Sequence, residues 1–252
     1  KFVKKEYDGR KFSFTKNLHF KDIDFKYDVA QKSALLNLNI EIESGSKVGI
    51  IGKSGSGKST FIDISLGLLE PDKGEILVDG VNIQQNIIGW QSQIGYVPQD
   101  VYLLDDTIKN NIIFSSNEKK TDIQKLNKII TTCNLNELVK NSDKGLETLV
   151  GDRGARLSGG QKQRIGIARA LYNNPKVIIF DEATSSLDIE NENKIIDEIF
   201  TIDRSKTLIL VTHRHQIVKN CDIIFLFENG KIVDQGTYEY LSKKHNFQKF
   251  SI

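Results

Sequence analysis

Gly52-Lys53-Ser54-Gly55-Ser56-Gly57-Lys58-Ser59-Thr60 is the stretch around which the chain is organised. It follows the apolar run 48–51 and precedes residues 61–66, whose composition suits a helix. In the spacing G-x-x-x-x-G-K-[ST], glycines let the backbone curl so that successive N–H groups, and the start of the next helix, point at one anion. The alternative is a flexible Gly/Ser loop, but the strand before it and the helix after it favour a phosphate-binding P-loop.

Seven positions of this loop are expected to bind a nucleotide. Lys58 is expected on the β- and γ-phosphates of a nucleotide, and the Ser59 hydroxyl on Mg²⁺. The residues expected to bind the nucleotide here are Gly52, Ser54, Gly55, Gly57, Lys58, Ser59 and Thr60.

Composition limits the function classes. The 252 residues can form one large domain or two unequal lobes. A net charge of +2, from 35 basic and 33 acidic residues, argues against non-specific nucleic-acid binding, which needs a strongly basic face. Cys133 and Cys221 lack metal-like spacing and are expected to be ordinary buried thiols in a reducing compartment.

The chain also lacks membrane and export signals. No apolar run approaches the roughly 20 residues that span a bilayer, and the first residues contain no signal-peptide core. We therefore expect the chain to be soluble as given. Because it contains no methionine, either processing has removed the initiator or the chain is a piece of a longer protein. We expect the second, with residues 1–17 a basic linker that arrives from an upstream domain.

Hydrophobic patterning predicts an α/β fold. Apolar residues alternate in 18–25 and 36–43, which indicates half-buried antiparallel strands. Residues 177–180 and 207–211 are continuous apolar runs typical of the middle of a parallel sheet. A further short strand is expected at 75–78, a crossover helix at 189–200, and a hairpin of residues 221–227 and 231–233 around Asn229-Gly230.

The sequence pattern between residues 105 and 172 is typical of helices, with candidate helices at 107–114, 123–132 and 135–140. We interpret this region as a helical insertion between two parts of a sheet domain. The predicted organisation is a P-loop core of residues 18–104 and 173–252, with an antiparallel N-terminal part and a helical subdomain of about 105–172 inserted into it.

Two carboxylates, Asp181 and Glu182, end the apolar strand 177–180. Ionised carboxylates are costly to desolvate without a partner, and a metal ion with its water supplies one. Asp181 would hold Mg²⁺, directly or through water, while Glu182 would orient and deprotonate the attacking water. The alternative is a strand that simply reaches solvent.

Leu157-Ser158-Gly159-Gly160-Gln161 opens an amphipathic helix and offers a second anion-binding helix end. Together, segments 52–60, 157–161 and 177–182, in this order and spacing, resemble the nucleotide-binding domain of ATP-binding cassette (ABC) proteins. The resemblance covers the chain from about Leu18 to its end. It implies the ABC ATPase fold with a RecA-like core, ATP and Mg²⁺ as ligands, and ATP contacts from the signature residues Ser158, Gly159, Gly160 and Gln161.

The resemblance also assigns single positions. Tyr27 resembles the aromatic residue on which adenine stacks, although it could be an ordinary strand aromatic. Gln99 resembles the glutamine that reaches Mg²⁺ and signals to the transport partner, and an amide oxygen is a neutral ligand that leaves easily. His213 resembles the histidine that contacts the γ-phosphate. Segment 185–188 is similar to the loop that crosses to the other monomer.

Segment 148–154, directly before the signature, resembles the part of ABC exporters that faces the coupling helices of the membrane domain. It carries Asp152 where glutamate is usual, which keeps the charge and shortens the reach. The resemblance implies an exporter half whose membrane domain precedes Lys1 on the same chain, at the cytoplasmic face of the inner membrane. Some short segments of the sequence also resemble bacterial lipid-linked oligosaccharide flippases. Such segments are shared widely among exporters, and lipid, lipid-linked glycan and peptide are all candidate substrates.

The implied mechanism is ATP hydrolysis at two composite sites in a head-to-tail homodimer. A soluble ABC protein acting on ribosomes or DNA is the alternative, but it should carry long coiled-coil or basic insertions. A binding-only regulator should lack the base or the histidine. Each ATP would contact Tyr27, Lys58, Ser59, Gln99, Asp181, Glu182 and His213 of one chain and Ser158 and Gly160 of the other.

Overall fold

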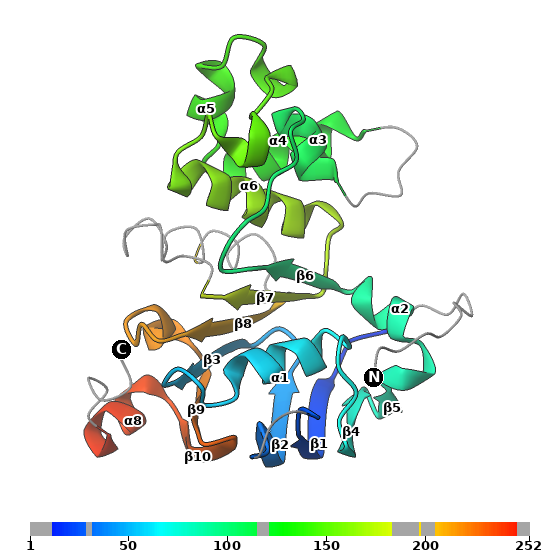
Figure 1. The fold of residues 1–252 in the computed structure, drawn as a ribbon, viewed down its shortest axis with the longest axis vertical. Coiled ribbons are helices and arrows are strands. Elements are labelled where there is room, and N and C mark those ends of the chain that lie inside the picture. Colours follow the sequence, from blue (N-terminus) through cyan, green and yellow to red (C-terminus); the bar gives the residue numbers. More distant parts are fainter. Residues whose placement is uncertain (1–11, 29–31, 115–120, 183–196, 198–204, 246–252) are drawn as a thin grey trace. The chain divides into compact units, whose positions relative to one another are not determined.

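The computed structural model describes residues 12–28, 32–114, 121–182, 197 and 205–245 (Figure 1). Its contacts divide the chain into two compact units. Unit 1 comprises residues 1–94 and 205–252, and unit 2 comprises residues 95–204. The two units are described separately below.

The first sheet of unit 1 is antiparallel, with strand order β2-β1-β4-β5. Leu18 lies opposite Ile42 and Phe20 opposite Ile40, and all four side chains are buried. The alternating pattern read from the sequence therefore buries one face of the sheet, and the predicted antiparallel pair is confirmed. The strands are β1 (Asn17–Phe25), β2 (Leu35–Glu43), β4 (Lys73–Val78) and β5 (Val81–Asn82).

The second group of strands in unit 1 is mixed, in the order β10-β9-β3-β8. β3 pairs in parallel with both β8 and β9, and every residue of β8 is buried, as its continuous apolar run predicts. β9 and β10 form the predicted antiparallel hairpin, with Asn229 and Gly230 both at positive φ. The strands are β3 (Lys47–Gly52), β8 (Thr207–Thr212), β9 (Ile223–Glu228) and β10 (Lys231–Gly236).

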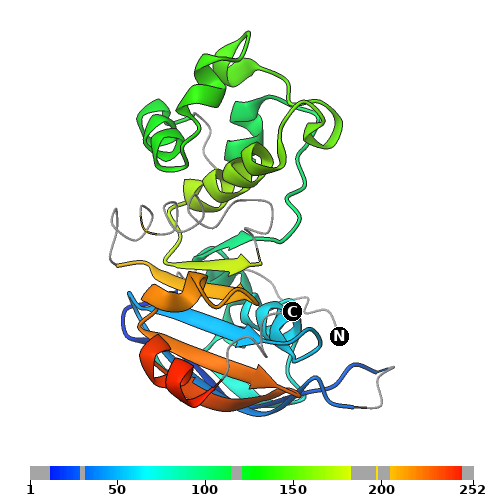
Figure 2. The same ribbon diagram turned by 90° about the vertical axis from the view of Figure 1, so that its left-hand side faces the viewer.

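Helix α1 (Lys58–Ser65) ties the two groups of strands together. Its Phe61 ring lies 4.7 Å from that of Phe20 on β1 and 5.6 Å from that of Phe227 on β9. Figures 1 and 2 show the helix beside β3, the strand that feeds into it. Burial of this helix therefore holds the loop at its start in place. The remaining helices of unit 1 are α2 (Ile87–Gln91), α8 (Tyr238–Lys244) and the 3₁₀ turns Ile83–Gln85 and Ile217–Asn220.

Residues 12–17 are the described part of the segment predicted to be a linker, and they contact the rest of unit 1. Phe14 is buried and packs edge-on against Trp90, with ring centroids 6.4 Å apart. The backbone amides of residues 15–17 and the Thr15 hydroxyl all donate to the Asp79 carboxylate. Burial opposes ionisation of Asp79, but these hydrogen bonds outweigh it and lower the pKa of the carboxyl. Residues 12–17 are thus packed on unit 1.

Unit 2 is built around helix α6, which α3 and α4 both contact. The three helices expected in this region are confirmed, while the one expected at 189–200 lies outside the described residues. Figure 1 shows the helices of this unit gathered together. The elements are β6 (Ile94–Val97), α3 (Ile108–Ile113), α4 (Ile123–Thr132), α5 (Asn136–Lys140), the 3₁₀ turns Gly145–Glu147 and Asp152–Gly154, α6 (Gly159–Tyr172) and β7 (Val177–Asp181).

Within the described ranges, no helix has both the length and the apolar character that crossing a membrane requires.

Both thiols are buried, as expected from the sequence. Burial raises the pKa of the Cys221 thiol to about 12. Relative to the ordinary thiol pKa of 9.0 this leaves about a thousandfold less of the reactive thiolate at neutral pH. We therefore expect a chromogenic disulfide reagent to leave Cys133 and Cys221 unmodified in the native chain and to label both in denaturant. Rapid stoichiometric labelling under native conditions would contradict this prediction.

Candidate functional site

The loop between β3 and α1 has the geometry of an anion cradle. Gly55 and Gly57 adopt φ of +76° and +107°, values that L side chains rarely adopt. A Cβ added to Gly55 would meet nothing within 4 Å, whereas one added to Gly57 would lie 2.7 Å from the Ala34 carbonyl oxygen. Gly55 therefore borders open space. The absence of a side chain at Gly57 lets the loop pack closely against the Ala34 carbonyl.

Positive charge converges on this cradle. Lys58 is 7% exposed, and its Nζ donates to the carbonyl oxygens of Gly52 at 2.6 Å and Lys53 at 3.0 Å. The ammonium is thus folded over the loop rather than extended into solvent. Helix α1 begins at this lysine, and its N-cap Gly57 supplies no side-chain cap. An anion at the loop would meet both the ammonium and the positive end of the helix.

The other predicted loop residues divide by exposure. Ser54 and Ser59 are exposed, while Thr60 is 6% exposed. Ser56, to which the sequence assigned no role, is also buried, and its hydroxyl finds no hydrogen-bond partner among the described residues. Its carbonyl accepts from the Gly230 amide at 3.0 Å, which attaches the loop to the β9–β10 hairpin. The sequence holds no signal for this contact because the two residues lie far apart in the chain.

Tyr27 and His213 belong to the same unit as the loop. The Tyr27 ring is 39% exposed and stands edge-on to Phe25, and its hydroxyl lies 3.2 Å from the Thr60 Oγ1 on α1. His213 follows the last residue of β8, and that residue, Thr212, pairs in parallel with Ile51 of β3. Both strands therefore end at the same edge, and His213 follows β8 there as the P-loop follows β3.

Unit 2 carries the carboxylates. Asp181 is the last residue of β7, and its Oδ2 accepts from the Tyr96 hydroxyl at 3.0 Å. Glu182 follows at φ +47°, a left-handed conformation that is uncommon for residues other than glycine. Such strained positions cluster at active sites, where the surrounding structure holds them. Gln99 is exposed and follows β6 by two residues. The Tyr96 contact could not be found from the sequence, since it joins residues 85 positions apart.

The chemistry of the predicted metal ligands fits Mg²⁺. Asp181, Gln99 and Ser59 offer a carboxylate, an amide oxygen and a hydroxyl, the hard oxygen donors that this ion prefers. Among the described residues, no group of three or more His, Cys, Asp or Glu side chains could hold a metal ion.

The signature residues form the start of helix α6. Ser158 is its N-cap, and its Oγ accepts from the Gln161 amide at 3.3 Å. Gln161 Oε1 accepts from the Ser158 amide at 2.9 Å, which completes a capping box. Gly159 is exposed at the first position of the helix. The Ser158 and Gln161 side chains therefore shape the helix end themselves, and the positive end of a 14-residue helix is presented at the surface.

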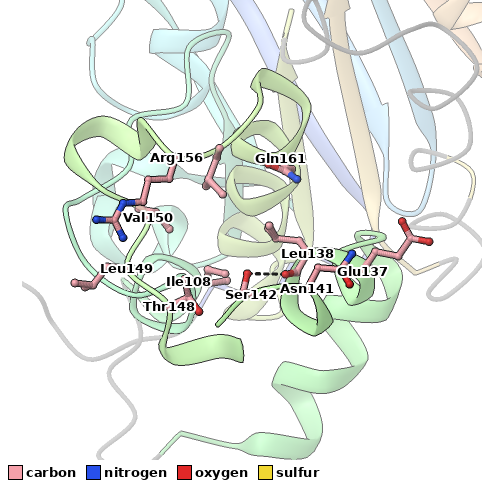
Figure 3. Close-up of a pocket in the computed structure, with 11 residues that line it drawn as sticks. Ile108, Glu137, Leu138, Asn141, Ser142, Thr148, Leu149, Val150, Arg156 and Gln161 are labelled. Atoms are coloured by element: carbon pink, nitrogen blue, oxygen red, sulfur yellow. Dashed lines mark hydrogen bonds between the residues drawn. The ribbon is translucent and has the colours of Figure 1, made fainter. Parts of the chain in front are cut away.

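A pocket of about 350 Å³ lies beside the signature (Figure 3). Leu157 and Gln161 line it together with Leu149 and Val150, which belong to the segment expected to face a membrane domain. Leu149 is half exposed, and Thr107 forms a β-bridge with it. Asp152, in the same segment, is exposed. The segment and the signature are thus neighbours within unit 2.

The predicted site residues therefore form two groups, one in each unit. Segment 185–188 lies outside the described residues. The first group, in unit 1, is Tyr27, the loop 52–60 and His213; the second, in unit 2, is Gln99, Asp181, Glu182 and 158–161.

Comparison with known proteins places this arrangement in context. The family described as "ABC transporter" matches residues 35–185. Over 231 residues, 91% of the chain, it is 41% identical to the leukotoxin translocation ATP-binding protein LktB of Pasteurella haemolytica-like sp. (strain 5943B) and to that of Mannheimia glucosida. It spans 32% of the length of these relatives. A bacterial Atm1-family ABC exporter solved with ATP bound superposes with a TM-score of 0.88 at 30% identity, over 96% of this chain and 43% of that one.

Proposed function

The chain belongs to the ABC transporter family, and from this premise we propose that it is the ATP-hydrolysing domain of an ABC exporter. The observation that carries the proposal is the loop at the start of α1, where buried Lys58 and an uncapped helix end converge on an open cradle. The exporter assignment draws on relatives that are named for translocation and on the similar Atm1-family structure. These similarities, and the near-neutral charge, do not favour a role on ribosomes or DNA.

Each site residue then has a proposed role. Lys58 and the loop amides bind the phosphates of ATP, and Tyr27 stacks on adenine. Asp181, Gln99 and Ser59 hold Mg²⁺, which neutralises phosphate charge when bound. Glu182 accepts the proton of the attacking water, and His213 contacts the γ-phosphate.

The proposed assembly is a head-to-tail dimer of two such domains. The capping box holds Ser158 and Gly159 at the surface, where a second copy can be reached. Each ATP is then bound by the P-loop of one chain and covered by the signature of the other.

A membrane domain is the second proposed partner, and it precedes this domain on the same chain. Unit 2 exposes the large apolar side chains of Tyr102, Leu104, Phe114 and Leu149. Hydrogen bonds join the segments that carry them to α6 and to one another. Exposed apolar groups of this kind suit a protein partner. The domain would therefore lie at the cytoplasmic face of the inner membrane. The relatives are named for leukotoxin translocation, and lipid, lipid-linked glycan and peptide all remain candidate substrates of this chain.

The exporter part is tested by the coding sequence upstream of Lys1. We expect it to encode six membrane spans. An upstream region that encodes none, in a protein whose ATPase activity is stimulated by ribosomes or DNA, would support the soluble alternative instead.

Tyr27→Ala tests the adenine contact. Stacking on an aromatic face is worth about 1 kcal/mol or somewhat more and is indifferent to the purine offered. We therefore expect ATP and GTP affinities to fall alike by about tenfold, measured by titration with the magnesium nucleotide. Tyr240→Ala, which removes an exposed tyrosine from α8, is the matched control and should bind normally.

Tyr27→Phe separates the ring from the hydroxyl. Phenylalanine keeps the ring but loses the hydrogen bond with Thr60, which is worth about 1 kcal/mol of stability. Affinity for ATP should stay within about twofold of the wild type. A phenylalanine variant as weak as the alanine variant would show that the hydroxyl binds the nucleotide and that the stacking account is wrong.

A further inference from the structure

Arg169, in the last turn of α6, bonds to a segment that lies shortly after Gln99. Its Nη1 donates to the Tyr102 carbonyl oxygen at 2.9 Å. Its Nε and Nη2 donate to Asn111, to the backbone carbonyl oxygen at 2.9 Å and to Oδ1 at 3.0 Å. The guanidinium also lies 5.2 Å from the centre of the Phe114 ring. One side chain thus joins α6 to two other parts of unit 2.

Asn111 extends these bonds to the same segment. Its side chain is fully buried, its Oδ1 accepts from the Leu104 amide at 2.9 Å, and its Nδ2 donates to the Leu104 carbonyl oxygen at 3.0 Å. The side-chain amide of Asn111 therefore bonds both backbone groups of Leu104, as a neighbouring strand would. Residues 102 and 104 are both held through backbone groups, so their position does not depend on their exposed side chains.

Packing fixes the residues between these bonds. A Cβ added to Gly166 of α6 would lie 2.5 Å from Val101 Cγ2, so the segment lies directly against the helix. Leu103 is fully buried and close to Gly154, where an added Cβ would lie 2.9 Å from its Cδ1. Residues 101 and 102 are therefore held directly by α6, and residues 103 and 104 by Gly154 and by Asn111 of α3.

We propose that Arg169 is a positioning residue, which sets the signature at the start of α6 relative to Gln99 by clamping residues 101–104. The proposal rests on the function proposed above, in which Gln99 and Ser158 both take part in ATP hydrolysis. Because the clamp begins two residues after Gln99, a displacement of that residue moves α6 and its signature with it. Arg169 touches no substrate atom and acts through the segment and the helix.

Lysine cannot replace arginine in this clamp. The planar guanidinium donates in three fixed directions, to Tyr102 and twice to Asn111, while an ammonium on a flexible stem cannot reproduce that fork. Arg169→Lys therefore keeps the positive charge but loses the fixed arrangement of three hydrogen bonds. Arg164→Lys is the matched control, since Arg164 lies on the same helix but donates to Asn134, away from residues 101–104.

The experiment measures steady-state ATP hydrolysis and ATP affinity for the wild type and both variants, normalised to nucleotide-binding sites. We expect Arg169→Lys to lower kcat by about ten- to a hundredfold, because small misplacements of site groups have effects of this size. KM and ATP affinity should change less than about twofold, since the P-loop belongs to unit 1. Arg164→Lys should leave both parameters near the wild type.

Hydrogen exchange supplies a readout that does not depend on activity. Amides of residues 102–104 should exchange faster in Arg169→Lys, while those of α4 keep their protection. Gly166→Ala is a second variant, which displaces Val101 without altering Arg169, and it should give the same selective loss of kcat.

Unchanged kcat together with unchanged exchange in Arg169→Lys would overturn the proposal. Equal losses in the Arg164→Lys control, with matching falls in melting temperature, would also overturn it, because they indicate general destabilisation. If the wild type itself hydrolyses no ATP, the proposed function fails, and the exchange of residues 102–104 still decides whether the clamp exists.

Discussion

Glu182→Gln is expected to lower ATP turnover by about two orders of magnitude or more while leaving ATP affinity close to that of the wild type. The amide has the shape of the carboxylate but cannot accept the proton of the attacking water. The side chain starts from a backbone at φ +47°, directly after the last residue of β7. Because hydrolysis stops after binding, the ATP-bound dimer should accumulate.

The measurement is steady-state phosphate release, with dimer content read by size-exclusion chromatography in magnesium ATP. Glu147→Gln is the matched control, since it makes the same chemical change in the same unit at an exposed residue paired with Lys109. It should hydrolyse ATP at the wild-type rate. Near-normal turnover by Glu182→Gln, free of wild-type contamination, would show that another group is the base.

The second large effect concerns the proposed composite site. Lys58→Ala removes an ammonium that bonds two loop carbonyls and that we propose binds the nucleotide phosphates, and we expect turnover to fall about a hundredfold or more. Ser158→Arg places a bulky cation at the signature and should be nearly inactive too. Ser158→Ala is the milder comparison, because it adds no bulky cation but removes the hydroxyl, and with it both the capping bond to Gln161, which costs about 1 kcal/mol of helix stability, and the proposed contact with ATP.

A mixture of the Lys58→Ala and Ser158→Arg chains distinguishes a composite site from one complete within a chain. In a mixed dimer one site contains both changes and the other contains neither, so the mixture should recover measurable hydrolysis if one intact site suffices. The specific activity of the wild-type chain should also rise with protein concentration in the micromolar range and above, as dimers form. Full activity of Ser158→Arg alone, with wild-type activity strictly linear in protein concentration, would place the whole site in one chain.

Local patterns in the sequence were enough to identify most elements of the fold. Alternation marked β1 and β2, continuous apolar runs marked β7 and β8, and Asn229-Gly230 marked the β9–β10 hairpin. The P-loop was equally readable. These features depend on residues within about ten positions of each other, where glycine, hydrophobic period and turn chemistry act directly on the backbone.

What only the tertiary structure decided are the contacts between distant segments. Phe14 packs on Trp90, which attaches the described end of the predicted linker to unit 1. Tyr96 bonds Asp181, and Arg169 holds the segment after Gln99. Each is a single hydrogen bond or ring contact between residues some 65 to 85 positions apart, and it has no periodicity that a sequence could display. The sequence alone therefore predicts which residues form the candidate site. The residues that contact and orient them are determined by how the helices and strands pack.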